Sequence, residues 1–207
     1  MKVLLVSNTD VLKNACNWEN VDEPEQVSYE KSILSCTGED KAKKMANLAI
    51  FSTIDKIFAS NYVSALSTAK YIARRNNIKI NVDSNLDESK IGILNDLTLE
   101  ELRQRQFKDL NYKLRNGESL SESQKRLNDF ILGINDADKT IVVVTHEIAI
   151  LSFLMLYCEA GYNYENELIL SYHNVVIDDG VRDLPIVFEV DIEDSKINKI
   201  KKLDIKF

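Results

Sequence analysis

The N-terminal stretch Lys2-Val3-Leu4-Leu5-Val6-Ser7-Asn8-Thr9 decides how the rest of the chain is interpreted. Its first part is short, rich in Val and Leu, and uncharged after the lysine, which is typical of a strand buried on both faces of a sheet. The apolar run stops at Ser7, and polar side chains follow. Ligands of parallel sheets bind beyond the carboxyl ends of the strands. Ser7, Asn8 and Thr9 are therefore the first candidates for a site.

Strand and helix patterns alternate along the remaining chain. Further strands are predicted at residues 54–59, 78–82, 140–144, 174–177, 185–191 and 196–203, and helices at residues 40–53, 64–76, 98–114, 119–134 and 148–160. The two capping boxes Thr98/Glu101 and Ser119/Glu122 favour helix starts, and Asp178-Asp179-Gly180 predicts a turn between antiparallel edge strands. This order predicts an α/β fold, a three-layer α-β-α sandwich around a mostly parallel sheet. We expect a single domain over residues 1–207 with a small helical insertion at about residues 93–137.

The composition is that of a globular protein with an acidic surface. The chain is 44% hydrophobic and 29% charged, with a formal net charge of -7. This charge argues against nucleic acid and anionic membranes as partners. The chain has no apolar run long enough to span a bilayer, and its N-terminal apolar run is too short for a signal peptide. The three cysteines show no CxxC spacing and are expected to be free thiols. Together these features predict a cytoplasmic protein.

Several short motifs follow the predicted strands in a fixed order. They are Leu34 with Gly38 and Ala42, Ser60-Asn61-Tyr62-Val63-Ser64-Ala65-Leu66-Ser67-Thr68-Ala69, Leu86-Asp87-Glu88 with Gly92, Gly117-Glu118-Ser119 with Arg126, and Thr145-His146-Glu147. In this order and spacing, and together with Ser7-Asn8-Thr9, they resemble the histidine phosphatase superfamily, the phosphoglycerate mutase-like proteins. The resemblance covers nearly the whole chain and implies the phosphoglycerate mutase-like fold.

The resemblance also implies a role for each position. Family members transfer a phosphoryl group through a nucleophilic histidine, clamp it with two arginines, and protonate the leaving group with a glutamate. Here Asn8 stands at the nucleophile, and Ser7 and Ser64 stand at the two arginines. Glu88 and the second histidine, His146, are kept. At positions that border the ligand, Asn14 matches a phosphate-binding asparagine, whereas Thr9 and Glu147 replace glycines.

These changes all weaken binding of a phosphoryl anion. Each lost charge-assisted hydrogen bond costs about 1.5–3 kcal/mol, and removing the nucleophile of a covalent enzyme costs roughly a millionfold in turnover. We therefore expect a catalytically inactive member that binds a neutral or cationic small molecule, or a protein partner, in a polar to acidic relic pocket. We expect no cofactor. The alternative is a weak or altered phosphomonoesterase that uses His146 and Glu88.

Other interpretations stay open. His146 is also explained as a hydrogen-bonded structural residue, and Gly117-Glu118-Ser119 as a helix cap. No metal site is expected, because Glu88, Glu147 and His146 lack a fourth ligand at a recognisable spacing. Anion binding returns as an option if a cation from elsewhere reaches the pocket. The candidates are Lys13, Lys31, Lys90, Arg103 and Arg105.

Overall fold

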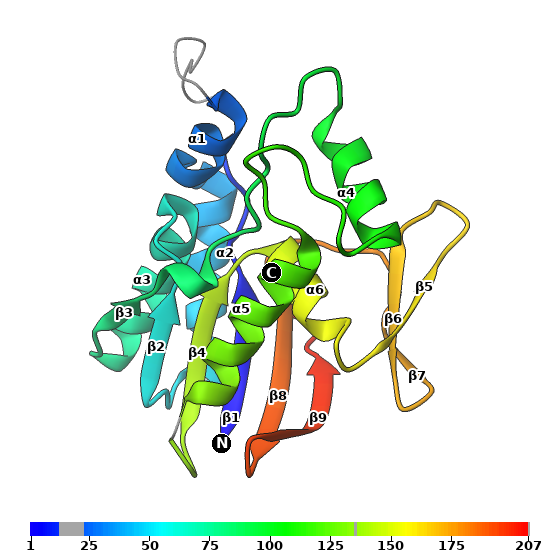
Figure 1. The fold of residues 1–207 in the computed structure, drawn as a ribbon. Helices are drawn as coiled ribbons and strands as arrows, with labels where there is room; N and C mark the ends of the chain where they lie inside the picture. Colours follow the sequence, from blue (N-terminus) through cyan, green and yellow to red (C-terminus); the bar gives the residue numbers. More distant parts are fainter. Residues whose placement is uncertain (13–22, 135, 207) are drawn as a thin grey trace.

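A six-stranded sheet forms the centre of the molecule (Figure 1). The structure is a computed structural model that describes residues 1–12, 23–134 and 136–206. The strand order is β3-β2-β4-β1-β8-β9. The strands are β1 (Lys2–Ser7), β2 (Lys56–Ala59), β3 (Ile80–Val82), β4 (Thr140–Thr145), β8 (Val187–Glu193) and β9 (Lys196–Lys202). β3, β2, β4 and β1 are parallel to one another, β8 is antiparallel to β1, and β9 is antiparallel to β8. The predicted mostly parallel sheet is therefore confirmed.

Helices cover both faces of this sheet. α2 (Cys36–Ala46) and α3 (Val63–Asn76) cover one face, and α5 (Leu120–Gly133) and α6 (Glu147–Leu154) cover the other. The described chain also contains the helices α1 (Pro24–Lys31) and α4 (Leu99–Lys108) and the 3₁₀ turns η1 (Ala49–Phe51) and η2 (Ser84–Leu86). Alternate residues of β1 point to opposite faces. Leu5 joins the apolar cluster under α5 and α6, whereas Leu4 joins the cluster under α2 and α3. The central strands are therefore buried on both sides, which explains their unbroken apolar sequence.

The ends of α2 and α4 differ from the sequence prediction. α2 begins at Cys36, because the hydroxyl of Ser35 accepts a hydrogen bond from the Gly38 amide, and it ends at Ala46. α4 ends at Lys108, since the carboxylate of Asp109 accepts a hydrogen bond from the Asn111 amide and so favours a turn over another helical turn. The polar helix α1 was not expected at all. Both predicted capping boxes are confirmed.

A second, three-stranded sheet was missed as a sheet, although its last strand agrees with the strand predicted at residues 174–177. It contains β5 (Glu159–Tyr162), β6 (Leu168–Tyr172) and β7 (Val175–Asp178). The predicted helix at residues 148–160 stops at Leu154, because the chain beyond it pairs with β6. β8 is not an edge partner of β7, since it pairs with β1 and β9 inside the central sheet. These pairings join distant segments, which local patterns do not encode.

Two smaller expectations concern membrane segments and cysteines. Within the described ranges, no helix combines the length and the hydrophobicity needed to cross a membrane. Cys36 and Cys158 are free thiols. Cys16 lies outside the described residues.

Candidate functional site

Most of the predicted site residues in the described chain lie at the carboxyl ends of β1, β2 and β4 or directly after them. Ser7 and Thr145 are aligned as partners at the end of the β1–β4 pair. The backbone amide of Asn8 donates to the Thr145 carbonyl at 2.9 Å, and that of Ser60 donates to the Val144 carbonyl at 3.0 Å. The sheet therefore holds Asn8, Ser60 and the start of α6 against one another.

His146 is the centre of a buried hydrogen-bond network at this edge. Its Nδ1 lies 3.0 Å from Oδ1 of Asn8, and its Nε2 lies 2.9 Å from Oγ of Ser60. The Ser60 hydroxyl also lies 2.8 Å from a carboxylate oxygen of Asp87. The ring of Tyr62 covers the imidazole at a centroid distance of 4.8 Å. His146 is only 4% exposed, so the network is closed to solvent on most sides.

The protonation state of this network follows from its burial. Desolvation, followed by the charge of Arg126, lowers the pKa of His146 to about 3, so the imidazole is neutral at physiological pH. The side-chain amide of Asn8 donates to the Thr9 carbonyl at 3.0 Å, which leaves its oxygen to accept from Nδ1 of His146. In this arrangement Nε2 accepts, and the Ser60 hydroxyl proton is shared between His146 and Asp87. Asn8 is thus an acceptor for the imidazole.

The other predicted polar residues at the ends of β1 and β2 are buried, and two of them make structural hydrogen bonds. The hydroxyl of Ser7, which is fully buried, accepts from the Ile186 amide at 2.9 Å. The hydroxyl of Thr9, also buried, donates to the Gly38 carbonyl at 2.9 Å. Ser64 is 2% exposed in the first turn of α3. The Ser7 and Thr9 side chains therefore connect the end of β1 to neighbouring elements.

Gly38 is required by this close packing. A Cβ at that position would lie 2.0 Å from the backbone oxygen of Asp10. The glycine that the sequence motif places at the start of α2 therefore lets this helix approach the loop after β1.

Glu88 is a buried carboxylate next to the His146 network. It is 4% exposed and accepts from the backbone amides of Ser89 at 2.9 Å and Ile148 at 3.2 Å. Burial raises its pKa, and the nearby charge of Arg103 opposes this rise. Burial also raises the pKa of Glu147, which follows His146. The predicted acidic character at this edge therefore includes two carboxylates that burial drives toward the protonated form.

Some of the candidate cations do come near this edge. Arg103 is 8% exposed and donates to the hydroxyl of Ser89 at 2.6 Å and to Oε1 of Gln106 at 2.7 Å. Arg105 is exposed and donates to the hydroxyl of Tyr112 instead. Lys13 and Asn14, which the sequence also singles out, lie outside the described residues.

A cavity of about 710 Å³, called here the side cavity, opens next to Glu88. Its walls are Glu30, Lys31, Asn61, Tyr62, Ser84, Asp87, Glu88, Lys90, Glu118 and Arg126. Two candidate cations, Lys31 and Lys90, therefore line a cavity beside the predicted pocket. Ser7, Asn8, Ser64 and His146 are not among its lining residues. Of the predicted site residues in the described chain, only Glu88 lies on the wall of the side cavity.

The Gly117-Glu118-Ser119 motif has a role beyond a helix cap. Ser119 caps α5 as predicted. Glu118 forms a two-point ion pair with Arg126 at 2.7 and 3.0 Å. The same guanidinium donates to the backbone carbonyls of Asn85 at 2.7 Å and Asp87 at 3.1 Å. This arginine therefore fixes the loop that carries Asp87 and Glu88.

Helix α1 forms another wall of the side cavity, which the sequence did not indicate. Its buried Gln26 lies 2.7 Å from the hydroxyl of Tyr62 and accepts from the Ile91 amide at 3.0 Å. Tyr29, on the same helix, has a raised pKa, first from burial and then from the charge of Glu88. A single glutamine in a polar helix gives no local signal for such contacts.

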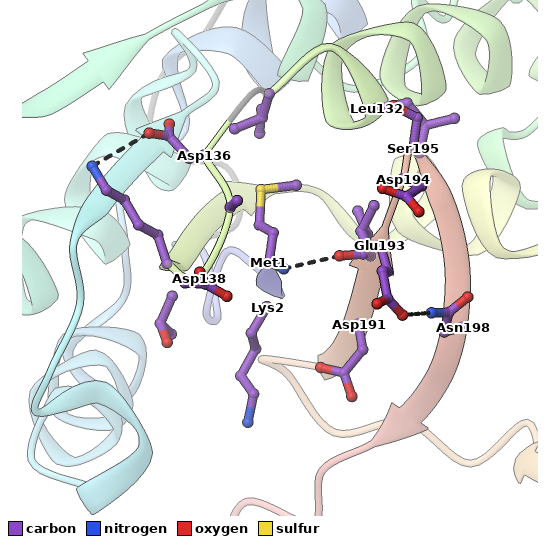
Figure 2. A pocket seen from close by; sticks show the side chains of 15 residues that line it. Met1, Lys2, Leu132, Asp136, Asp138, Asp191, Glu193, Asp194, Ser195 and Asn198 are labelled. Atoms are coloured by element: carbon purple, nitrogen blue, oxygen red, sulfur yellow. Dashed lines mark hydrogen bonds and ion pairs between the residues drawn. The ribbon is translucent and has the colours of Figure 1, made fainter.

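The opposite end of the sheet has a cavity of different character (Figure 2). It measures about 830 Å³ and is lined by the starts of β1 and β4 and the end of β8. Its polar walls include Asp136, Asp138, Asp191 and Glu193. Asp136 is paired with Lys56 and Lys139. None of the predicted site residues lies there. In the described part of the chain, no three His, Cys, Asp or Glu side chains are placed to hold a metal ion.

Comparison with known proteins identifies the family. No curated protein matches the chain. Among solved structures, a putative alpha-ribazole-5'-P phosphatase from Escherichia coli is 18% identical, with a TM-score of 0.65 over 99% of this chain and 96% of that chain. A mycobacterial glucosyl-3-phosphoglycerate phosphatase in complex with inorganic phosphate is 14% identical, with a TM-score of 0.65 over 99% and 95%. Bacillus stearothermophilus YhfR is 16% identical, with a TM-score of 0.65 over 95% and 94%.

These structural likenesses establish a shared fold. The sequence profile of the histidine phosphatase superfamily (branch 1) matches residues 17–179, which is more than half of the 207-residue chain. The matched span begins after Asn8 and includes Glu88 and His146. The chain therefore belongs to the histidine phosphatase superfamily.

Proposed function

We propose that this chain binds a small molecule at the carboxyl end of its sheet and does not carry out phosphohistidine chemistry. The observation that carries the proposal is the contact between Asn8 and His146. By resemblance, Asn8 stands where the superfamily has its nucleophilic histidine. Its carboxamide oxygen instead accepts a hydrogen bond from His146, at 3.0 Å, in a buried network. An amide held in this way has no free nucleophilic nitrogen.

The electrostatics of the network support the same proposal. Among the described residues, no lysine or arginine donates a hydrogen bond to Asn8, Ser60 or His146. His146 is neutral, with a pKa of about 3. A phosphoryl group carries its charge on several oxygens, and active sites stabilise that charge with preorganised cations and donors. This network offers neither an arginine clamp nor an imidazolium.

The second candidate function is a weak phosphomonoesterase that uses His146 and Glu88. One observation favours it. Burial raises the pKa of Glu88, and a raised pKa suits a carboxylic acid that protonates a leaving group. Against it stands the absence of any described cation bonded to the network around His146.

Turnover of p-nitrophenyl phosphate distinguishes the two candidate functions. We expect hydrolysis no faster than the buffer rate for the wild type, His146→Gln and Glu88→Gln. His173→Asn serves as the matched control, since His173 is the only other histidine and lies in an exposed turn. Turnover that His146→Gln abolishes and His173→Asn leaves intact would overturn the proposal and establish the phosphomonoesterase.

A further inference from the structure

The side cavity contains charges of both signs that are not all paired with each other. Arg126 is occupied by Glu118 and by backbone carbonyls. The side-chain ammonium groups of Lys31 and Lys90 form no hydrogen bond or ion pair with the described part of the chain. Both lysines are exposed. Two ammonium groups from different elements are therefore available on the rim.

The free negative charge lies deeper than this rim. Asp87 and Glu30 are both half-buried. One carboxylate oxygen of Asp87 accepts from Ser60 and Asn61, and one of Glu30 accepts from Gln26. The second oxygen of each accepts no hydrogen bond from the described residues. Two carboxylate oxygens remain available inside the cavity.

These two carboxylates lie close enough to affect each other. The pKa of Asp87 is raised by burial first, and the charge of Glu30 adds to the rise. The pKa of Tyr62 is raised by burial and then by both carboxylates. Asp87 and Glu30 therefore face a common space beside the Tyr62 ring, where a cation would relieve their repulsion.

We propose that the side cavity binds an organic zwitterion, with its ammonium group against Asp87 and Glu30 and its carboxylate toward Lys31 and Lys90. The inference rests on the proposed function, since it names the ligand class of that same region. A metal ion is disfavoured because no three suitable side chains are grouped within the described residues. The volume of about 710 Å³ is in the range that holds a small organic ligand. Because the two charges sit at different depths, the ligand's charged groups are separated by several bonds.

Isothermal titration calorimetry with four compounds tests the ligand class. 6-Aminohexanoate and L-norleucine are isomers that differ in charge separation, whereas hexylamine and hexanoate each carry one charge. We expect 6-aminohexanoate to bind at least tenfold more tightly than hexylamine, hexanoate or L-norleucine, as the loss of one charge-assisted contact predicts. Equal or tighter binding of hexanoate or L-norleucine, or no binding of any compound, would overturn the proposal.

Matched variants test the placement of the two charges. Glu30→Gln and Asp87→Asn should each weaken 6-aminohexanoate binding about tenfold, whereas Glu25→Gln on the same helix should not. Lys31→Gln and Lys90→Gln should each weaken it about threefold, because exposed charges are screened. Lys44→Gln is their control. Unchanged binding by Glu30→Gln, which removes no contact to the strand ends, contradicts the assignment.

The same samples separate this inference from the proposed function. Turnover of p-nitrophenyl phosphate that depends on His146 would refute the proposed function, whatever the calorimetry shows. A sample without such turnover and without 6-aminohexanoate binding would refute the zwitterion site alone.

Discussion

The His146 network and the side cavity lie next to each other but differ in whether their polar groups have partners. In the network, the two imidazole nitrogens have partners at 3.0 and 2.9 Å and the ring is almost fully buried. In the side cavity, Lys31 and Lys90 are exposed and unpaired within the described chain. Asp87 belongs to both regions, because it bonds to Ser60 and also lines the cavity. A buried network in which the polar groups have hydrogen-bond partners stabilises a fold. Charged groups without a partner in a cavity are available to bind a ligand.

The largest expected effect on stability comes from removing the imidazole at the centre of the network. His146→Ala should lower the free energy of unfolding by about 3 kcal/mol, because it leaves a cavity under Tyr62 and removes partners from Asn8 and Ser60. Urea unfolding measures this loss. His173→Asn is the control and should change stability by less than about 0.5 kcal/mol, since asparagine tolerates the positive φ of 50°. Equal effects of both variants would contradict a stabilising network.

The pH dependence of stability should report the same buried imidazole. The folded pKa of His146 is about 3 and the ordinary value is 6.5, so the unfolded chain binds more protons between these values. The stabilisation is complete above pH 6.5 and is lost as the pH falls toward 3. At pH 5 the loss amounts to about 2 kcal/mol.

Comparing the wild type with His146→Gln isolates the contribution of His146 to the pH dependence of stability. The difference in stability between pH 7 and pH 5 should be smaller in His146→Gln. Glu88 acts in the opposite direction, because its raised pKa favours the folded state as the pH falls, but it is present in both proteins. An equal pH dependence of the two proteins would show that His146 is not buried in the neutral form.

A smaller effect is expected where the network meets the side cavity. Ser60→Ala should lower stability by about 1–2 kcal/mol, because His146 and Asp87 both lose the hydroxyl between them. Thermal unfolding measures the loss. A neutral result would mean that the hydroxyl is not shared in solution.

The smallest effect is expected on the rim of the side cavity. Lys31→Gln and Lys90→Gln should each change stability by less than about 0.5 kcal/mol, because neither side chain has a partner in the described chain. A loss as large as that of Ser60→Ala would show that the rim is structural, and the contrast between the two regions would disappear.

The sequence predicts much of the edge where these regions meet. The apolar run of β1 and the parallel strand order place Asn8 and His146 together, because the carboxyl ends of parallel strands share one edge. The capping boxes also encode helix starts locally. Gln26 could not be anticipated, since its contacts with Tyr62 and Ile91 join elements far apart in the chain. β5 and β6, and their pairing with the predicted strand β7, were missed for the same reason.

The charge of the site was predicted only in part. The loss of charge around Asn8 is what the resemblance to the family implies, and it stays a prediction. The positions of the lysines of the side cavity depend on where α1 and the loop after η2 lie. The ion pair between Arg126 and Glu118 likewise becomes visible only in the folded structure. The residues at the strand ends therefore do not indicate the lysines Lys31 and Lys90 that line the side cavity.

The most direct test of the central claim is intact-mass spectrometry after incubation with p-nitrophenyl phosphate and rapid quenching at alkaline pH, where phosphohistidine is preserved. We predict no phosphoryl adduct on the wild type, because Asn8 offers no nucleophile and neutral His146 is held on both ring nitrogens. A phosphoryl adduct that is absent from His146→Gln would contradict the account.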